Sequence, residues 1–135
     1  EFLEEARRLG VRMAVATAAP EVNVEFILDG LDLRKYFAAV TTADDVARGK
    51  PDPEIFLKSA EKLGVEPAGC IVFEDALGGF EAARRAGMTA VGIATVNSVE
   101  EIMRLGSVAE AHPDFSGLSA QELIARRVPF SAVTN

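Results

Sequence analysis

The hydrophobic positions of this chain alternate between short continuous apolar runs and longer stretches with helical spacing. Continuous runs at 11–17 and 70–73 are typical of strands that are covered on both faces of a parallel sheet. Helical spacing of apolar residues marks 2–9, 53–63 and 76–86, and a glycine follows each of these segments. Alternating strands and helices with short connections predict βαβ units, so we expect an α/β fold built on a doubly wound parallel sheet.

The remaining elements have weaker patterns. The segment 110–115 predicts an edge strand, because Pro113 cannot donate a hydrogen bond to a central ladder. The segment 119–127 predicts a helix with Ser119 as its N-cap and Glu122 completing a capping box. Two further helices and two further strands are expected at 20–31, 99–105, 39–42 and 89–94. No repeat or linker divides the chain, and its 135 residues are typical of one domain.

Composition and charge exclude several classes of protein. The chain is 49% hydrophobic and 26% charged, which is typical of a folded α/β domain and not of a disordered one. Its net charge of −7 leaves no basic stripe for nucleic acid or an anionic membrane surface, so neither is expected as a partner. No apolar run reaches the ~18 residues that a membrane helix needs. Because Cys70 is the single cysteine, we expect no intrachain disulfide and a cytoplasmic protein.

Polar residues of three kinds fall where the predicted strands end. Thr17 ends the first continuous run, Glu74 and Asp75 end the second, and Lys50 lies in a loop that enters the helix at 53–63. Because ligands bind at the carboxyl ends of strands in open α/β sheets, we expect these groups to share one edge. A hydroxyl and an ammonium suit an anion, and paired carboxylates suit Mg²⁺, which prefers oxygen ligands. The combination predicts phosphoryl transfer, which depends on positioning and on neutralising charge.

Four stretches of sequence carry a resemblance to a known family. They are VATA at 15–18, GKPDP at 49–53, FEDALGG at 73–79 and AARRAGM at 82–88. In this order they closely resemble the β-phosphoglucomutase-like branch of the haloacid dehalogenase-like (HAD) hydrolase superfamily, and the match covers nearly residues 1–110. The GKPDP segment together with ED-x₃-G-x₂-A is a specific pair at this spacing.

The resemblance implies a role for each of the polar residues. Thr17 and the Ala18 amide would hold the transferring phosphoryl group, and Lys50 would neutralise its charge and orient the nucleophile. Glu74 and Asp75 would hold Mg²⁺, directly or through water. The implied activity is that of a magnesium-dependent phosphatase acting on a small phosphorylated metabolite through an aspartyl-phosphate, with a sugar phosphomutase as the alternative.

The sequence departs from the family at its front. The family's Asp-x-Asp-Gly segment, which supplies the nucleophile and the general acid/base from the central strand, does not occur here, and most of the helical cap is missing. We therefore interpret 1–135 as one partial HAD-like core that lacks its N-terminal strand. Within it, 1–10 is the end of the helix from cap to core, 11–127 is the core and 128–135 is a tail.

The missing strand has two expected consequences. It would lie between the strands that end at Thr17 and Glu74, which leaves two inner edges unpaired and favours self-association. Without the nucleophile, Thr17 and Lys50 can only stabilise an attack that another residue makes. We therefore expect negligible phosphatase activity from this chain alone.

Other interpretations fit the residues less well. Cys70 begins a buried strand at the far end from the ligand edge, so neither a nucleophilic pair nor a zinc site with His112 is expected. A response-regulator receiver carries similar residues in a different order, with its acidic pair first. A purely scaffolding domain stays open, although a scaffold has no reason to retain two carboxylates facing a lysine.

Overall fold

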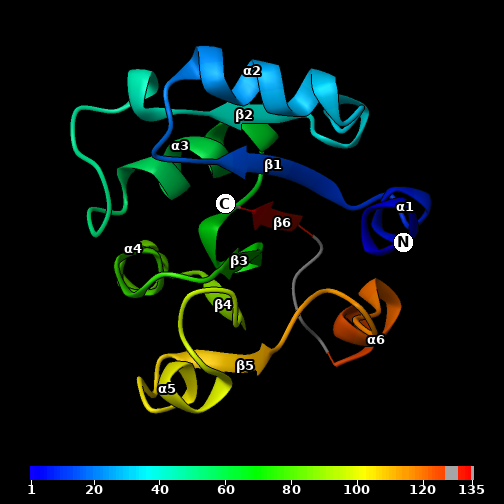
Figure 1. The fold of residues 1–135 in the computed structure, drawn as a ribbon, viewed down its shortest axis with the longest axis vertical. Coiled ribbons are helices and arrows are strands. Elements are labelled where there is room, and N and C mark those ends of the chain that lie inside the picture. Colours follow the sequence, from blue (N-terminus) through cyan, green and yellow to red (C-terminus); the bar gives the residue numbers. More distant parts are fainter. Residues whose placement is uncertain (127–130, 135) are drawn as a thin grey trace.

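The computed structural model describes residues 1–126 and, as backbone, 131–134. Its centre is a six-stranded sheet with the strand order β2-β1-β6-β3-β4-β5, in which every neighbouring pair runs parallel (Figure 1). The strands in chain order are β1 Arg12–Ala16, β2 Ala39–Thr41, β3 Cys70–Glu74, β4 Thr89–Ile93, β5 Val108–His112 and β6 Ser131–Thr134. The predicted α/β fold with a parallel sheet is confirmed.

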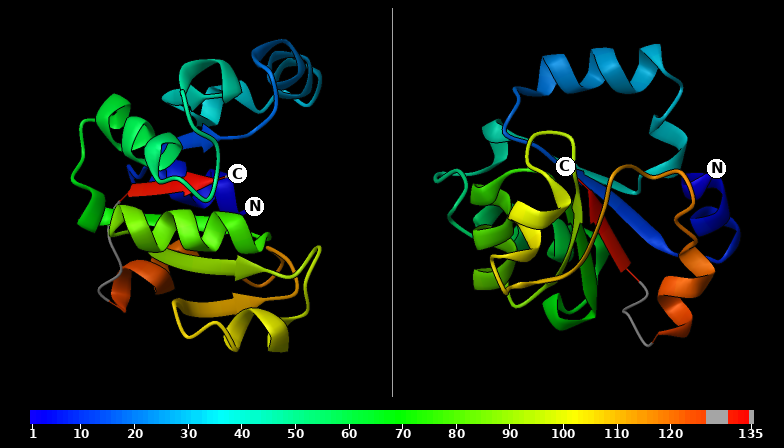
Figure 2. Two further views of the ribbon diagram at one scale, coloured as in Figure 1. Left: turned by 90° about the vertical axis from the view of Figure 1, so that its left-hand side faces the viewer. Right: turned by 60° about the horizontal axis from the view of Figure 1, so that its bottom comes forward.

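Helices cover both faces of this sheet. The described α-helices are α1 Phe2–Arg8, α2 Glu21–Gly30, α3 Glu54–Leu63, α4 Leu77–Ala86, α5 Val99–Met103 and α6 Ala120–Ala125. One face packs against α3, α4 and α5, and the opposite face packs against α1 and α6 (Figure 2). Along β3 the side chains alternate: Val72 packs with Phe56 and Phe80, whereas Phe73 packs with Phe2. All residues of β3 are buried, as expected for a strand covered on both faces.

The centre of the sheet is occupied by the last strand of the chain. β6 pairs with β1 on one side and with β3 on the other, and Val133 is in register with both Ala14 and Val72. The expectation of two unpaired inner edges is therefore wrong, and these edges are not open for self-association. The physical reason is that buried backbone N–H and C=O groups require partners, which a strand between β1 and β3 provides. β6 comes from 128–135, a segment that the sequence pattern marks only as a tail.

The capping of α6 ties this helix to α1. Ser119 accepts a hydrogen bond from the Glu122 N–H (3.2 Å), which confirms the predicted N-cap, whereas the predicted capping box with the Glu122 carboxylate does not form. The carboxylate that completes the cap comes from Glu5 of α1, which accepts from the N–H groups of Ala120 (2.9 Å) and Gln121 (3.2 Å). β5 lies at the edge of the sheet, as predicted, but it spans Val108–His112 and not 110–115, so Pro113 lies just outside the ladder.

Removing β6 should unpair the inner strands. A chain that ends at Arg126 loses the partner of both β1 and β3, so we expect a lower melting temperature and fast amide hydrogen exchange in Arg12–Ala16 and Cys70–Glu74. A chain in which 128–134 is replaced by glycine and serine keeps its length and should behave in the same way. Full exchange protection of β1 and β3 in both variants would contradict the position of β6.

Candidate active site

The carboxyl ends of β1, β6 and β3 lie at one edge of the sheet. Thr17 follows β1, Glu74 ends β3 and Asp75 follows it. Neighbouring strands are about 4.8 Å apart, which places Thr17 and Glu74 roughly 10 Å from each other across β6. Lys50 reaches the same edge from the loop before α3 and contacts Glu74 directly. The structure thus groups Lys50, Glu74 and Asp75, with Thr17 at the far side of the group.

Lys50 and Glu74 form a buried ion pair. The Lys50 ammonium donates to Glu74 Oε2 at 3.0 Å, and the two side chains are 11% and 0% exposed. The ammonium also lies 5.1 Å from the centroid of the Phe56 ring, within the range of a cation–π interaction. Burial lowers the pKa of Lys50, and the neighbouring Glu74 carboxylate opposes this shift. The pair therefore places a positive charge at the edge of the sheet, and the Glu74 carboxylate compensates this charge.

The second oxygen of Glu74 caps the turn that leads into α4. Glu74 Oε1 accepts from the N–H groups of Asp75 (3.1 Å) and Ala76 (3.2 Å). A Cβ atom at Gly79 would lie 2.0 Å from the Glu74 carboxyl carbon, so no side chain fits at that position. The buried carboxylate is thus enclosed by α4, Lys50 and two backbone amides, and its place in the site is fixed.

The loop that carries Lys50 is held by the first residue of α3. The Glu54 carboxylate accepts from the N–H groups of Ala47 (3.0 Å) and Arg48 (3.2 Å), which lie three and two residues before Lys50. The Glu54 N–H in turn donates to the Asp52 carboxylate at 3.0 Å. These bonds fold the loop back onto the start of α3, which fixes the backbone from which Lys50 extends.

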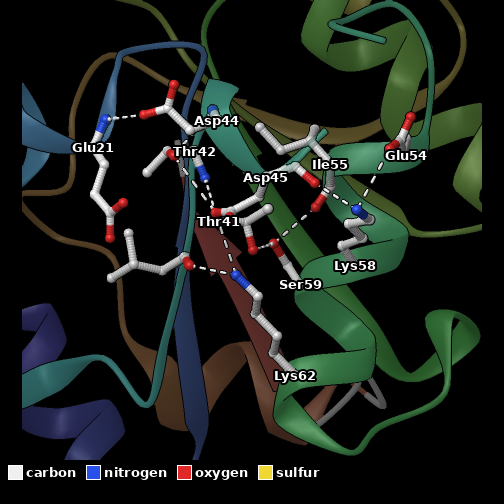
Figure 3. Close-up of polar contacts among 11 residues, drawn as sticks. Glu21, Thr41, Thr42, Asp44, Asp45, Glu54, Ile55, Lys58, Ser59 and Lys62 are labelled. Carbon is white, nitrogen blue, oxygen red and sulfur yellow. Dashed lines mark hydrogen bonds and ion pairs between the residues drawn. The ribbon is translucent and has the colours of Figure 1, made fainter. Parts of the chain in front are cut away.

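Polar side chains of α3 also fasten the helix to the end of β2 (Figure 3). The buried hydroxyls of Ser59 and Thr41 are hydrogen-bonded at 2.9 Å. Lys62 contacts the Asp45 carboxylate at 3.4 Å, and Lys58 donates to the Asp45 carbonyl oxygen. The segment between β2 and α3, which contains Lys50, is therefore fixed at both ends.

Asp75 is held by the loop that follows β4. The Thr95 hydroxyl donates to Asp75 Oδ2 at 2.6 Å, and the Asn97 amide donates to the Asp75 carbonyl oxygen at 3.0 Å. The pKa of Asp75 lies below its ordinary value, chiefly because of the Thr95 hydrogen bond, while burial opposes the shift. Asp75 is half-buried and ionised at neutral pH, so its carboxylate can bind a cation.

Thr17 shapes the turn after β1. Its hydroxyl accepts from the Ala19 N–H at 3.1 Å, and its own N–H donates to the Thr41 carbonyl at 3.0 Å. The Ala43 N–H donates to the Ala19 carbonyl at 3.3 Å, so the turn is also tied to the residues after β2. Ala18 lies inside this turn, and the Thr17 hydroxyl keeps its proton for an anion, because a hydroxyl is both donor and acceptor.

An apolar pocket adjoins the acidic end of the site. It has a volume of about 480 Å³, and its lining includes Glu74, Asp75 and Thr95. Its wall includes the rings of Phe2 and Phe115, whose centroids are 5.5 Å apart. The described residues that line it do not include Thr17 or Lys50. The pocket therefore lies on the α1 side of the sheet, beside the polar edge.

The residues at this edge suit a magnesium ion that keeps several water ligands better than an ion enclosed by protein ligands alone. Within residues 1–126, no three His, Cys, Asp or Glu side chains come together to hold a metal. Both oxygens of Glu74 already accept from Lys50 and backbone amides, which leaves Asp75 as the better carboxylate for direct contact. Mg²⁺ commonly binds through one or two carboxylates and keeps several waters, which matches this donor set.

Sequence reasoning missed four residues that shape the site. Glu54, Thr95 and Asn97 act through hydrogen bonds that no local sequence pattern predicts. The bonds from Thr95 and Asn97 to Asp75 join residues at least 20 positions apart. Gly79 lies in the ED-x₃-G-x₂-A segment, but only the position of the Glu74 carboxylate shows why no side chain fits there.

Comparison with known proteins decides the family. The model of the haloacid dehalogenase-like hydrolases matches residues 1–87. The chain belongs to this family. It is 38% identical over 116 residues to a phosphorylated carbohydrates phosphatase of Thermotoga maritima, covering 84% of this chain and 54% of that protein. It is 49% identical over 81 residues to a fructose-1-phosphate phosphatase of Escherichia coli, covering 60% of this chain and 43% of that protein.

A solved structure places this HAD-like chain near the branch that its motifs indicate. The β-phosphoglucomutase of Clostridium difficile superposes with a TM-score of 0.80 and 26% identity, over 93% of this chain and 52% of that one. The predicted resemblance to β-phosphoglucomutase-like HAD proteins is thereby confirmed. The chain spans about half the length of the curated relatives it matches.

A methyl group at position 79 should disrupt the ion pair. Gly79→Ala puts its Cβ on the Glu74 carboxylate, so we expect a loss of about 1–3 kcal/mol in the free energy of unfolding, measured by urea denaturation. Gly78→Ala is the matched control, because its Cβ meets nothing closer than Lys50 Cβ at 4.0 Å. Equal stability of the two variants would show that Glu74 is not enclosed by α4.

Proposed function

We propose that this chain provides the phosphate- and magnesium-binding side of a phosphatase that acts on small phosphorylated metabolites. The observation that carries the proposal is the buried Lys50–Glu74 pair beside Asp75, at the carboxyl edge of a parallel sheet. Support for the substrate class comes from the relatives, which are named as phosphatases of phosphorylated carbohydrates and of fructose 1-phosphate.

Each polar residue has a role in this proposal. The Thr17 hydroxyl and the Ala18 N–H donate to oxygens of the phosphoryl group, and Lys50 neutralises its charge. Phosphoryl transfer spreads negative charge over the equatorial oxygens, so fixed donors and cations at these oxygens lower the barrier. Because Glu74 compensates much of the Lys50 charge, a second cation at Asp75 adds the attraction that a phosphate dianion requires.

Magnesium is the proposed cofactor. Asp75 would hold the ion directly, and Glu74 would support it through the shared backbone turn or through a water molecule. When bound, the ion supplies positive charge at a phosphoryl oxygen. The chain's own contribution is to hold an ionised carboxylate at a fixed place beside the phosphate donors.

The nucleophile in this proposal lies outside the 135 residues. No Asp-x-Asp-Gly segment occurs in the sequence, and the aspartyl-phosphate that the family resemblance implies needs such an aspartate. A sugar phosphomutase is the second candidate, favoured by the structural likeness to β-phosphoglucomutase. A scaffolding role accounts for the Lys50–Glu74 pair as a structural contact, but it gives no reason for the second carboxylate, Asp75, beside that pair.

We place the protein in a reducing compartment, the cytoplasm, because its single cysteine is buried in β3 as a free thiol. Among the described helices, none combines the length and apolar character that a membrane crossing requires.

Inorganic phosphate should bind to the chain in a Lys50-dependent manner. We expect saturable binding in the presence of Mg²⁺, measured by ³¹P NMR, and at least a tenfold loss (~1.4 kcal/mol) in Lys50→Gln. Lys50→Arg should retain most of the affinity, because the charge stays. Lys35→Gln is the control, since Lys35 is an exposed lysine whose ammonium pairs with Asp32. Equal weakening by the Lys50 and Lys35 substitutions would contradict a phosphate site at Lys50.

The chain by itself should not turn over a phosphate ester. Incubated with Mg²⁺ and fructose 1-phosphate, it should release no phosphate above the rate in buffer, because the residues that stabilise the attack are present without the attacking group. The assay is colorimetric phosphate release, with Lys50→Gln as the background sample. Turnover that Lys50→Gln abolishes would mean that a nucleophile lies within these 135 residues.

A further inference from the structure

Two side chains of one loop hold Asp75 from two directions. Thr95 bonds its carboxylate at 2.6 Å, and Asn97 bonds its backbone carbonyl at 3.0 Å. Both residues follow β4, the strand next to β3, and neither belongs to the motifs on which the family resemblance rests. Side chain and backbone of Asp75 are thus fixed by the same short segment.

This loop has a defined position of its own. Its start is tied to β5 by the Ala94 N–H, which donates to the His112 carbonyl at 2.8 Å, and its end is the Ser98 cap of α5. α5 in turn packs closely on β4, because Ile102 is fully buried and a Cβ at Gly92 would lie 2.6 Å from its side chain. The donors that reach Asp75 therefore come from an anchored segment.

A fixed donor changes what an aspartate can do. A carboxylate beside solvent rotates freely about its last side-chain bond, and a cation that binds it must first order that rotation. The Thr95 hydrogen bond falls in the short range typical of a hydroxyl that donates to an ionised carboxylate. This bond orders the Asp75 carboxylate before a cation binds. Because Oδ2 already accepts from Thr95, the lone pairs that remain for a cation point in a fixed direction.

We propose that Thr95, assisted by Asn97, is the positioning residue of Asp75 and thereby sets the affinity of the site for a divalent cation. The inference rests on the proposed role of Asp75 as the magnesium ligand. Glu74 cannot take the place of Asp75 as the direct ligand, because its two oxygens already accept hydrogen bonds from Lys50 and from the turn into α4. Groups that orient a metal ligand in this way are commonly worth about 10- to 100-fold in metal affinity.

The test titrates the chain with Mn²⁺ and follows the free ion by electron paramagnetic resonance. Thr95→Val removes the hydroxyl at nearly constant volume and should weaken Mn²⁺ binding roughly tenfold. Thr95→Ser restores the donor and should bind within about twofold of the wild type, as a rescue that a purely structural role would not produce. Thr89→Val removes a hydroxyl from the opposite end of β4 and serves as the matched control with unchanged binding.

Two further variants complete the experiment. Asn97→Ala should also weaken Mn²⁺ binding, by less than Thr95→Val, because it frees the backbone of Asp75 and leaves the carboxylate bond. Asp75→Asn should abolish saturable binding. Thermal melting of every variant shows that the protein is folded at the temperature of the titration.

The outcomes separate the two claims. Wild-type affinity in Thr95→Val, or Thr95→Ser as weak as Thr95→Val, overturns the positioning role while the Asp75 site itself stands. Absence of saturable Mn²⁺ binding in the wild type, or wild-type affinity in Asp75→Asn, overturns the proposed metal site and the positioning role together. Weak binding in Thr95→Val with rescue in Thr95→Ser supports both.

Discussion

The ion pair between Lys50 and Glu74 is the constraint on which the rest of the site depends. Placing a carboxylate with no exposed surface at the end of β3 is unfavourable unless its charge and its lone pairs are satisfied. Lys50 supplies the charge, and two backbone amides and the bare backbone at Gly79 supply the hydrogen bonds and the space. Because these partners come from separate segments, the pair fixes the loop before α3 and the start of α4 relative to the sheet.

The same pair explains why the two carboxylates, Glu74 and Asp75, have different roles. Glu74 is already engaged in the ion pair with Lys50, so its neighbour Asp75 is the carboxylate that stays accessible beside the sheet edge. The loop after β4 then orders Asp75 from the other side through Thr95 and Asn97. An ammonium that is already compensated attracts a phosphate weakly by itself. A cation at Asp75 and donors from the turn at Thr17 are therefore the natural complement in the proposed phosphatase.

Sequence patterns were sufficient for the parts of the molecule that have local signals. The apolar runs at 11–17 and 70–73 form β1 and the fully buried β3, and the glycines after α3 and α4 end those helices in the left-handed conformation. β6 was missed, because four residues carry no periodicity and their partners are set by the whole sheet. Thr95 was missed for a related reason: its bond to Asp75 joins residues 20 positions apart through a loop without a motif.

The most direct test of the account is the titration of the Lys50 ammonium, followed by NMR of the ¹⁵N-labelled side chain. A buried lysine held by Glu74 should have a pKa below the ordinary lysine value, and Glu74→Gln should lower this pKa further, because the carboxylate is the group that opposes the effect of burial. A Lys50 pKa at the ordinary value, unmoved by Glu74→Gln, would mean that the side chain is solvated and that the ion pair does not organise the site.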